Sequence, residues 1–368
     1  MELTLLNTSL DAISIVEDYE SLIWTDRYQE YGDFEIYTPV TQEILSVLKQ
    51  DYYLINRDSE HTMIIEKLLI KTDVELGNHI TVTGRSLESI LKRRIVWGQR
   101  SITGNLQNGI KTMFEENIIN PEDPARKIDN FIFEESTDER ITSLNIDIQC
   151  TGDELYDVVV KLCKEHNIGF KVILNDNKQF VFKLYAGTDR SYDQTENTYV
   201  IFSPNFENIV NSNYIESKSA MKNVTLVGGE GEGAERRYYT VGSASGLERR
   251  ELFTDARDIS STEHYSEQIN GEYVSHEKTF TEEEYNALLQ QRGLEKLSEN
   301  IDIVSFEGEI EPTMMFRYQE DFFNGDIVQI ENEYGHATTA RIIEMTISEN
   351  EQGTSVYPTF STISEKGE

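Results

Sequence analysis

The sequence is poor in residue types that mark several common classes of protein. Only 2 of its 368 residues are cysteine, Cys150 and Cys163, and only 6 are proline. Two cysteines provide neither a disulfide framework nor the ligand spacing of a metal site. We therefore expect two reduced thiols, with Cys163 on the core-facing side of a helix.

Basic residues are scarce relative to acidic ones. The chain has 33 Lys and Arg against 67 Asp and Glu, which gives a formal net charge of −34. Contacts to nucleic-acid phosphates need clustered Lys and Arg, so this composition argues against nucleic-acid binding as the purpose of the surface. Hydrophobic residues make up 38% and aromatic residues 10% of the chain, which predicts a folded protein, and its 368 residues give room for two or three domains.

Long apolar runs are absent as well. No run approaches the roughly 20 residues that a membrane-spanning helix needs. The first residues also lack the basic start of a signal peptide. We expect a chain that has no membrane span, is made in the cytoplasm and is soluble there.

Signatures of catalysis and cofactor binding are missing too. The six histidines form no His-Glu-x-x-His pair, and no Cys-His or Ser-His arrangement stands out. The glycine-rich run 228–233 lacks the Lys-Ser/Thr pair of a phosphate loop, and Glu230 and Glu232 would repel phosphate. Asp176 and Asn177 do not continue into a calcium-binding series. We expect no catalytic, cofactor-binding or metal-binding residues and no cofactor, although 67 acidic residues leave paired carboxylates possible in principle.

What the sequence does contain is a β pattern that occurs twice. The first copy comprises 32–39, 51–55, 64–66 and a hairpin ending at 84, and the second comprises 306–312, 325–330, 342–344 and a turn at Gly353 into 355–357. Pro39 and Glu66 are 27 residues apart, and Pro312 and Glu344 are 32 apart, so the copies differ by a loop-sized amount. A duplicated module doubles the apparent symmetry of a symmetric oligomer.

The pattern of elements predicts an α+β, mainly β fold with two related small β-barrels and an α+β domain. Closure into barrels is expected because it removes exposed strand edges. The helices of the α+β domain and the insert are marked by capping boxes at 151–154 and 281–284, and a hairpin is predicted at 170–174 and 180–184. The predicted domains are a first β-barrel (1–92), an α+β domain (93–205), the first part of a second β-barrel (206–242), an insert with a helix that packs with the α+β domain (243–303), and the second part of the second β-barrel (304–368).

Several segments, in this order, resemble the tail hub proteins of long-tailed bacteriophages, the family that forms baseplate hubs and the N-terminal part of tail-associated lysins. The segments are 24–28 with 32–35, 85–91 with 94–96, 200–203, 222–224 with 228–233, and 325–328. The resemblance implies two pseudo-symmetric β-barrels, an α+β domain and a homotrimer. Three chains with two barrels each would form a ring that joins a six-fold tail tube or distal tail protein to a three-fold tip and forms or closes the DNA ejection channel.

The same resemblance implies the partners and the location of the protein. The partners are a distal tail protein or tail tube protein, a tape measure protein and, indirectly, receptor-binding or fibre proteins, while DNA passes through without specific binding. The location is the virion tail tip, after synthesis and assembly in the host bacterial cytoplasm. Acidic residues could line the channel or could equally solvate the outer surface.

The resemblance also predicts that the chain is structural rather than enzymatic. Many relatives continue into a long C-terminal region with a peptidoglycan-cleaving enzyme or a fibre, whereas this sequence ends at Glu368. Wall cleavage is therefore not assigned to these residues. Two alternatives stay open: a cell-wall hydrolase or carbohydrate-binding module, and the hub of a phage-derived contractile injection system.

Overall fold

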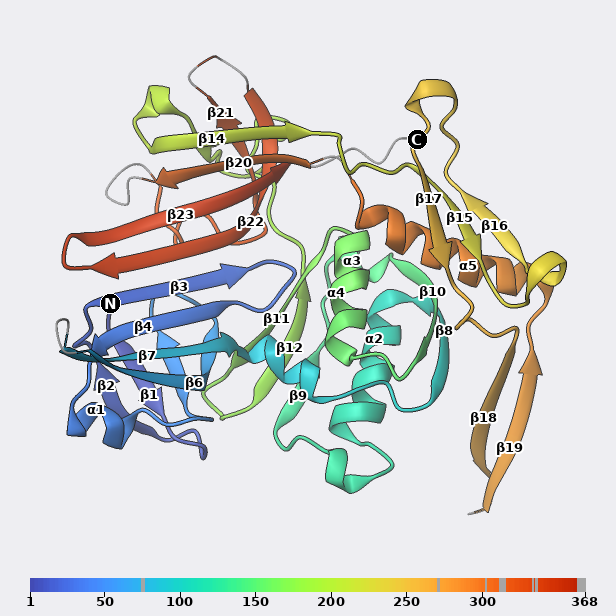
Figure 1. Ribbon diagram of the computed structural model, residues 1–368, viewed down its shortest axis with the longest axis horizontal. Helices are drawn as coiled ribbons and strands as arrows, with labels where there is room; N and C mark the ends of the chain where they lie inside the picture. The colour runs from blue at the N-terminus through green and yellow to red at the C-terminus, as the bar shows by residue number, and fades with distance from the viewer. Residues whose placement is uncertain are drawn as a thin grey trace.

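The computed structural model describes residues 1–73, 77–269, 272–301, 303–310, 316–332, 334 and 337–362 (Figure 1). Pro312, one of the residues that define the repeat in the sequence, lies outside this part of the chain. No helix within the described residues is long and apolar enough to cross a membrane.

The first β module contains seven strands and one short helix. Their bounds are β1 (Leu3–Leu6), β2 (Ala12–Val16), β3 (Ser21–Arg27), β4 (Asp33–Pro39), α1 (Gln42–Val47), β5 (Tyr53–Asn56), β6 (Thr62–Asp73) and β7 (Gly77–Ser86). In β4, Phe34 and Ile36 are buried while Glu35 between them is exposed, which is the alternation expected of a strand with one face on the core. The module has its own apolar core, which includes Trp24, Leu54 and Val82.

The second β module is assembled from two distant stretches of the chain. Its elements are β13 (Ile201–Phe202), the 3-10 turn η4 (Pro204–Phe206), β14 (Ile209–Ser217), β20 (Ile303–Ile310), β21 (Ile327–Glu331), β22 (Ala337–Asn350) and β23 (Gly353–Thr362). Phe202 and Phe360 pack at its centre, with ring centroids 5.4 Å apart. Both side chains are fully buried, so this module also has an independent core.

The mainly β fold is confirmed, but the described strands do not form two closed barrels. β3 pairs with β22, and the strands of both modules thereby join one 13-stranded sheet. β14 lies at one end of this sheet and β2 at the other (Figure 1). The edge of one module is thus covered by the other module, which satisfies its backbone groups without closure of either.

The α+β part lies beside the large sheet. Its elements are η1 (Leu87–Arg93), β8 (Gln99–Asn105), α2 (Leu106–Phe114), the π-turn η2 (Glu115–Ile119), η3 (Pro124–Arg126), β9 (Phe131–Glu134), α3 (Glu139–Thr142), β10 (Asn145–Thr151), α4 (Leu155–Glu165), β11 (Gly169–Leu174) and β12 (Phe180–Tyr185). The predicted hairpin is confirmed as β11 and β12. The capping box predicted at 151–154 is wrong. The residue before the first turn of α4 is Glu154 rather than Thr151, and the Glu154 side chain makes no capping hydrogen bond. The Thr151 amide instead donates to the Asp153 carboxylate at 2.9 Å.

The last part is an insert with a small sheet, a helix and a projecting hairpin. Its elements are β15 (Val224–Gly228), η5 (Gly233–Glu235), β16 (Tyr238–Val241), η6 (Gly246–Glu248), β17 (Glu251–Asp255), β18 (Thr262–Ile269), β19 (Glu272–Thr279) and α5 (Glu282–Ser298). The capping box at Thr281 and Glu284 is confirmed at the start of α5. Within the predicted range 206–242, only β14 joins the large sheet, because β15 pairs with β16 and β17 in a separate small sheet under α5. α5 also packs on β10 and α4.

Candidate functional site

The two β modules have the same order of strand pairing. The first runs β3-β4-β7-β6-β5-β1 and the second runs β14-β20-β23-β22-β21-β13. Corresponding pairs are antiparallel in both modules except the last, which is antiparallel for β5 and β1 but parallel for β21 and β13. The repeat seen in the sequence is therefore a repeat of topology.

A β-bulge occurs at the same point of each module. The extra residue is Glu66 in β6, opposite β7, and Ile343 in β22, opposite β23. The bulges align Glu66 with Ile343, one residue away from the alignment with Glu344 that the sequence pattern suggests. Because a bulge bends its strand and increases the local twist, both modules are shaped in the same way at this point.

The junction between the modules is formed by β3 and β22. Arg27 stands opposite Glu344, and its Nε donates to Glu344 Oε2 at 2.6 Å. Arg27 Nη1 donates to Asp33 Oδ2 at 2.5 Å. The backbone amide of Tyr28 donates to the carbonyl oxygen of the bulge residue Ile343 at 3.0 Å. The bulge of the second module thus accepts a hydrogen bond from the end of β3.

Tyr28 is the fully buried side chain at which both modules and the α+β part meet. Its hydroxyl donates to the carbonyl oxygen of Asn167 at 3.2 Å, and the Arg341 guanidinium lies 5.1 Å from the ring centroid. Gly169 and Gly325 lie against the ring, where a Cβ would come within 2.3 and 2.4 Å of a ring carbon. Glycine is required at both positions by this close approach, and Gly325 also has a φ of +96°.

Asp26 is a buried carboxylate next to this junction. It accepts hydrogen bonds from Trp24 Nε1 at 3.0 Å, Ser59 Oγ at 2.8 Å and the Tyr318 hydroxyl at 3.0 Å. Burial raises the pKa of Asp26, although the nearby charge of His61 and these donors act in the opposite direction. Tyr318 packs against the core of the second module, so Asp26 links the two modules through a buried polar contact.

His61 and Glu88 form a buried ion pair behind Asp26. His61 Nδ1 lies 2.9 Å from Glu88 Oε1, which also accepts the Val172 amide at 2.9 Å. Burial would lower the pKa of His61, but the charges of Glu88 and Asp26 outweigh burial and Lys171 and raise the pKa to about 9. Burial would likewise raise the pKa of Glu88, but His61 holds it below its usual range. Glu88 therefore connects the first module to the α+β part, because it pairs with protonated His61 of the first module and accepts the amide of Val172 in β11.

We expect this cluster to make stability depend on pH in the alkaline range. The pKa of His61 is about 9 when folded and 6.5 as its ordinary value, so its contribution is complete below pH 6.5 and is lost as the pH rises through 9. The free energy of unfolding should fall by about 3 kcal/mol across this interval, since each pKa unit corresponds to about 1.4 kcal/mol. Urea unfolding followed by circular dichroism from pH 6 to pH 10 measures the change, and a flat or rising profile would contradict the prediction.

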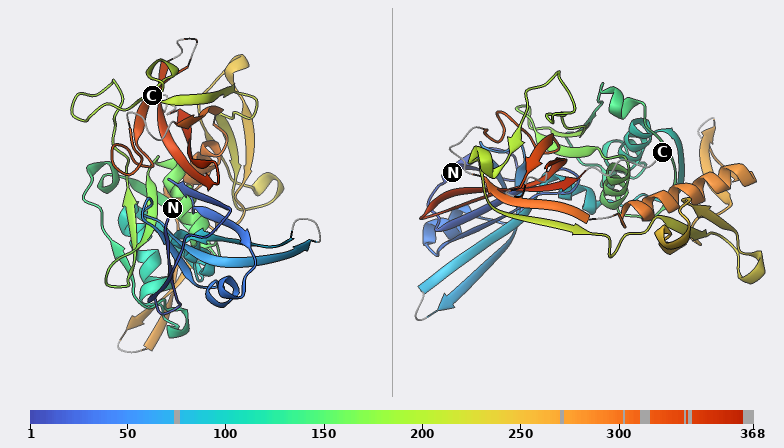
Figure 2. Two further views of the ribbon diagram at one scale, coloured as in Figure 1. Left: turned by 90° about the vertical axis from the view of Figure 1, so that its left-hand side faces the viewer. Right: turned by 90° about the horizontal axis from the view of Figure 1, so that it is seen from above.

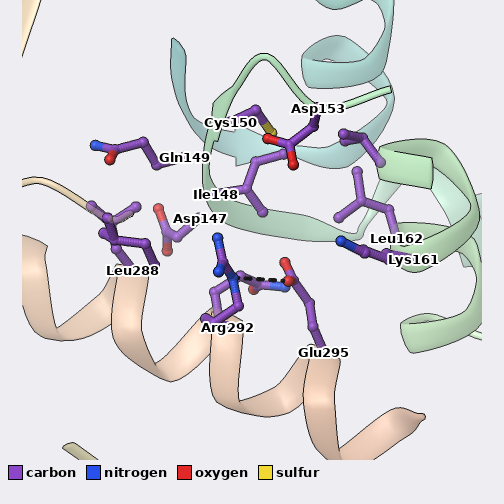
Figure 3. A pocket seen from close by; sticks show the side chains of 13 residues that line it. Asp147, Ile148, Gln149, Cys150, Asp153, Lys161, Leu162, Leu288, Arg292 and Glu295 are labelled. Carbon is purple, nitrogen blue, oxygen red and sulfur yellow. Dashed lines mark ion pairs between the residues drawn. The ribbon is translucent and has the colours of Figure 1, made fainter. Parts of the chain in front are cut away.

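A small cavity lies between α5 and the β10–α4 pair (Figure 3). It holds about 30 Å³, which is room for roughly one water molecule. Arg292 lies 3.5 Å from Glu295 and 2.8 Å from Asp258. Burial raises the pKa of Glu295 and Asp147, and it raises the pKa of Cys150 to about 12. The cavity thus contains a neutral thiol and a paired arginine, with no space for a sugar ring.

The glycine-rich run is fixed by contacts within the insert. The amide of Glu230 donates to the Tyr285 hydroxyl oxygen at 2.7 Å, and Glu230 Oε2 accepts the Ser261 amide at 2.8 Å. A Cβ at Gly229 would lie 2.5 Å from the Tyr285 hydroxyl oxygen, and Gly231 has a φ of +101°. These contacts account for the glycines as a tight turn between strands.

The sequence nominated no site residue. Among the described residues, no group of three or more His, Cys, Asp or Glu is arranged to hold a metal ion. Cys163 is fully buried on the core side of α4, as expected. Sequence reasoning missed the cluster of Asp26, His61 and Glu88. A signal was present, because Asp26 and Glu88 lie in the segments 24–28 and 85–91 that carry the family resemblance.

Comparison with protein families gives a match over nearly the whole chain. The family described as "Siphovirus ReqiPepy6 Gp37-like protein" matches residues 2–361. No curated protein sequence matches the chain.

Comparison with solved structures gives several matches along the full length. The prophage tail protein gp18 from Listeria monocytogenes EGD-e has a TM-score of 0.54 at 13% identity, covering 100% of this chain and 96% of that chain. The 43 kDa tail protein of prophage MuSo2 from Shewanella oneidensis has a TM-score of 0.59 at 12% identity, covering 98% of each chain. The tail protein from Neisseria meningitidis MC58 has a TM-score of 0.56 at 10% identity, covering 100% of this chain and 97% of that chain. At these identities the similarity establishes the fold.

Proposed function

The chain belongs to the family of Siphovirus ReqiPepy6 Gp37-like proteins and has the fold of prophage tail proteins, and from this premise we propose that it is a structural hub at the tip of a phage tail. Three copies form a homotrimer in which six β modules make a ring. The ring joins a six-fold tail tube or distal tail protein to a three-fold tip. Family and fold agree with the resemblance to phage tail proteins that the sequence predicted.

One observation carries this proposal: the chain contains the same β module twice, with matching strand order and matching bulges. A three-chain ring with two such modules per chain presents six similar positions around its axis. A six-fold partner can then contact six similar surfaces on one face of the ring. The α+β part and the insert, which occur once per chain, keep three-fold symmetry.

The partners follow from the position of the ring. We propose contacts with the tail tube protein or distal tail protein and with the tape measure protein, and indirect contacts with receptor-binding or fibre proteins. DNA passes through the ring, or is held back by it, without specific binding. A trimer carries a formal charge of 3 × −34, or −102, and negative residues at the channel would repel the phosphates of passing DNA.

The proposed role is structural rather than enzymatic. The cavity beside Glu295 is too small for a sugar substrate, so this cavity is not a site for a cell-wall hydrolase or a carbohydrate-binding module, although open pockets of about 630 and 640 Å³ lie beside Trp97 and Ile15. The hub of a phage-derived contractile injection system would use the same ring. The genes next to this one would distinguish that system from a phage tail.

The mass of the purified chain in solution tests the proposal. Light scattering over a concentration series should give the mass of three 42.4 kDa chains, and electron microscopy should show rings with an open centre and six similar lobes. A chain that stays monomeric, and that still forms no ring when a tail tube or distal tail protein is added, would contradict the proposed function. Cleavage of peptidoglycan by the purified chain would also contradict it.

A further inference from the structure

Besides β2 and β13, which each pair with one strand, two strand edges of the large sheet have no partner strand within the described residues. β14 lies at the end of the sheet and pairs only with β20. Residues 67–72 of β6 pair with β7 on one side, and on the other side the pairing with β5 stops at Ile64. Figure 1 shows β14 near the top of the stacked strands and β6 beside β7 in the first module, and Figure 2 shows the light-blue β6–β7 hairpin extending away from the rest of the chain.

These two edges are the counterparts of the two strands that pair at the module junction. β6 corresponds to β22, because in each strand the last described pair of the hairpin lies seven positions after the bulge, at Asp73 after Glu66 and at Asn350 after Ile343. On this alignment, Leu69 corresponds to Thr346 and Ile70 to Ile347.

The alignment of β14 with β3 follows from the strand that each one pairs with. Phe34 of β4 and Phe306 of β20 stand at equivalent registers, opposite Gly84 of β7 and Phe360 of β23. Trp24 pairs with Phe34, and Tyr214 pairs with Phe306. Tyr214 therefore corresponds to Trp24, and the next residue, Ile215, corresponds to Thr25.

The exposure of these residues differs according to whether the strand has its partner. Ile347, which β3 covers, is 5% exposed, whereas its counterpart Ile70 is 50% exposed. Thr25, which β22 covers, is 4% exposed, whereas its counterpart Ile215 is 41% exposed. Both unpaired edges thus present large apolar side chains at the positions that are buried at the junction. Exposed apolar strand edges of this kind favour pairing with a further strand.

We propose that β14 of one copy pairs antiparallel with residues 67–71 of β6 of a second copy, repeating between chains the junction that β3 and β22 make within a chain. Leu69 then stands opposite Ile215, as Thr346 stands opposite Thr25. Ile70 stands opposite Tyr214, as Ile347 stands opposite Trp24. This inference rests on the proposed trimer and identifies the strands and the register that hold it together.

The occupant of each edge is a second copy of this chain for two reasons. Every copy carries both a β14 edge and a β6 edge. A contact between these two different edges can repeat from chain to chain, and it forms a closed ring when the rotation between neighbouring chains adds up to a full turn. Lys67 and Lys71 also lie in the unpaired part of β6. Lysines on an edge strand oppose pairing with unrelated strands, so they favour a specific partner of opposite charge. Each copy has a net charge of −34, so these lysines bring positive charge to an acidic neighbour.

Disulfide cross-linking of the full chain tests the register. The double variant Leu69→Cys/Ile215→Cys is oxidised with oxidised glutathione, and chain masses are read on denaturing gels with and without reductant. Directly opposed strand residues are close enough for a disulfide, whereas Cys150 and Cys163 are buried. The matched control is Ile15→Cys/Ile215→Cys, because Ile15 is 55% exposed on β2, outside the proposed pair.

Covalent trimers that form at least about tenfold faster than in the control pair are the expected result, because strand pairing gives the thiols a high effective concentration. Hydrogen exchange of the unmodified chain supplies a second readout, with slower exchange at 67–71 and 213–215 at high protein concentration. A trimeric mass without preferred 69–215 links or slower exchange overturns the strand pairing and leaves the proposed trimer standing. Preferred links in species of steadily growing mass support the pairing and reject the closed ring. A monomer at every concentration, with no preferred link, overturns the pairing.

Discussion

Replacement of Glu88 by glutamine is expected to lower the free energy of unfolding by about 3–5 kcal/mol near pH 6.5, because one partner of a buried ion pair is removed. Glu88 and His61 are almost completely inaccessible to solvent, and no other acidic group lies within ion-pair distance of His61 in the described structure. In Glu88→Gln, protonated His61 keeps only the more distant charge of Asp26. Urea unfolding monitored by circular dichroism measures the loss.

The matched control is Glu20→Gln, which removes the partner of a partly exposed histidine. His79 Nε2 lies 3.3 Å from Glu20 Oε2, and the Glu20 side chain is 42% exposed. A loss of about 1 kcal/mol or less is expected there, since solvent screens such a pair. Glu88→Gln should also remove most of the fall in stability between pH 6.5 and pH 9. Equal effects of the two substitutions, or an unchanged pH profile, would show that the buried pair does not stabilise the fold.

Replacement of Trp24 by alanine is expected to cost about 3–5 kcal/mol of unfolding free energy, the usual range for an aromatic side chain removed from a core. Trp24 is fully buried at the module junction, where it stands opposite Phe34 on one side and Ile347 on the other. Its Nε1 also donates to Asp26, so the substitution removes one of the donors of a buried carboxylate. Denaturant unfolding followed by circular dichroism provides the measurement.

The second tryptophan of the chain supplies the control for this experiment. Trp97 is 64% exposed, and the Arg126 guanidinium lies 4.5 Å from its ring centroid. Trp97→Ala removes one exposed cation–π contact, so a change of about 1 kcal/mol or less is expected. A Trp24→Ala variant that unfolds at the same denaturant concentration as Trp97→Ala would mean that the junction does not contribute to stability.

Much of the secondary structure could be predicted because its signals are local. The alternation of Phe34, Glu35 and Ile36 predicts a strand, and the cap at Thr281 with Glu284 predicts the start of α5. The predicted capping box at Thr151 is wrong because Asp153 turns back to bond the Thr151 amide before the helix begins. A short polar motif permits both arrangements, and the packing of the neighbouring elements selects one of them.

The candidate site could not be predicted in the same way, because its residues are brought together from distant parts of the chain. Asp26, Glu88 and Tyr318 come from a strand, a 3-10 turn and a loop that are far apart in the sequence. A charged residue in a β pattern carries no local sign that it will be buried. The family-like segments around Asp26 and Glu88 gave the sole indication, and they did not show which groups would meet.

Three properties can be inferred without coordinates: the chain is mainly β, one β module occurs twice, and several segments resemble phage tail proteins. These properties depend on short-range patterns and on their order, both of which can be read along the chain. Tertiary structure alone decided that the modules share one sheet through β3 and β22, that the bulges align Glu66 with Ile343, and that β6 and β14 keep unpaired edges. Strand pairing is non-local, because any strand edge offers the same amides and carbonyls and only the packing of complete modules selects its partner.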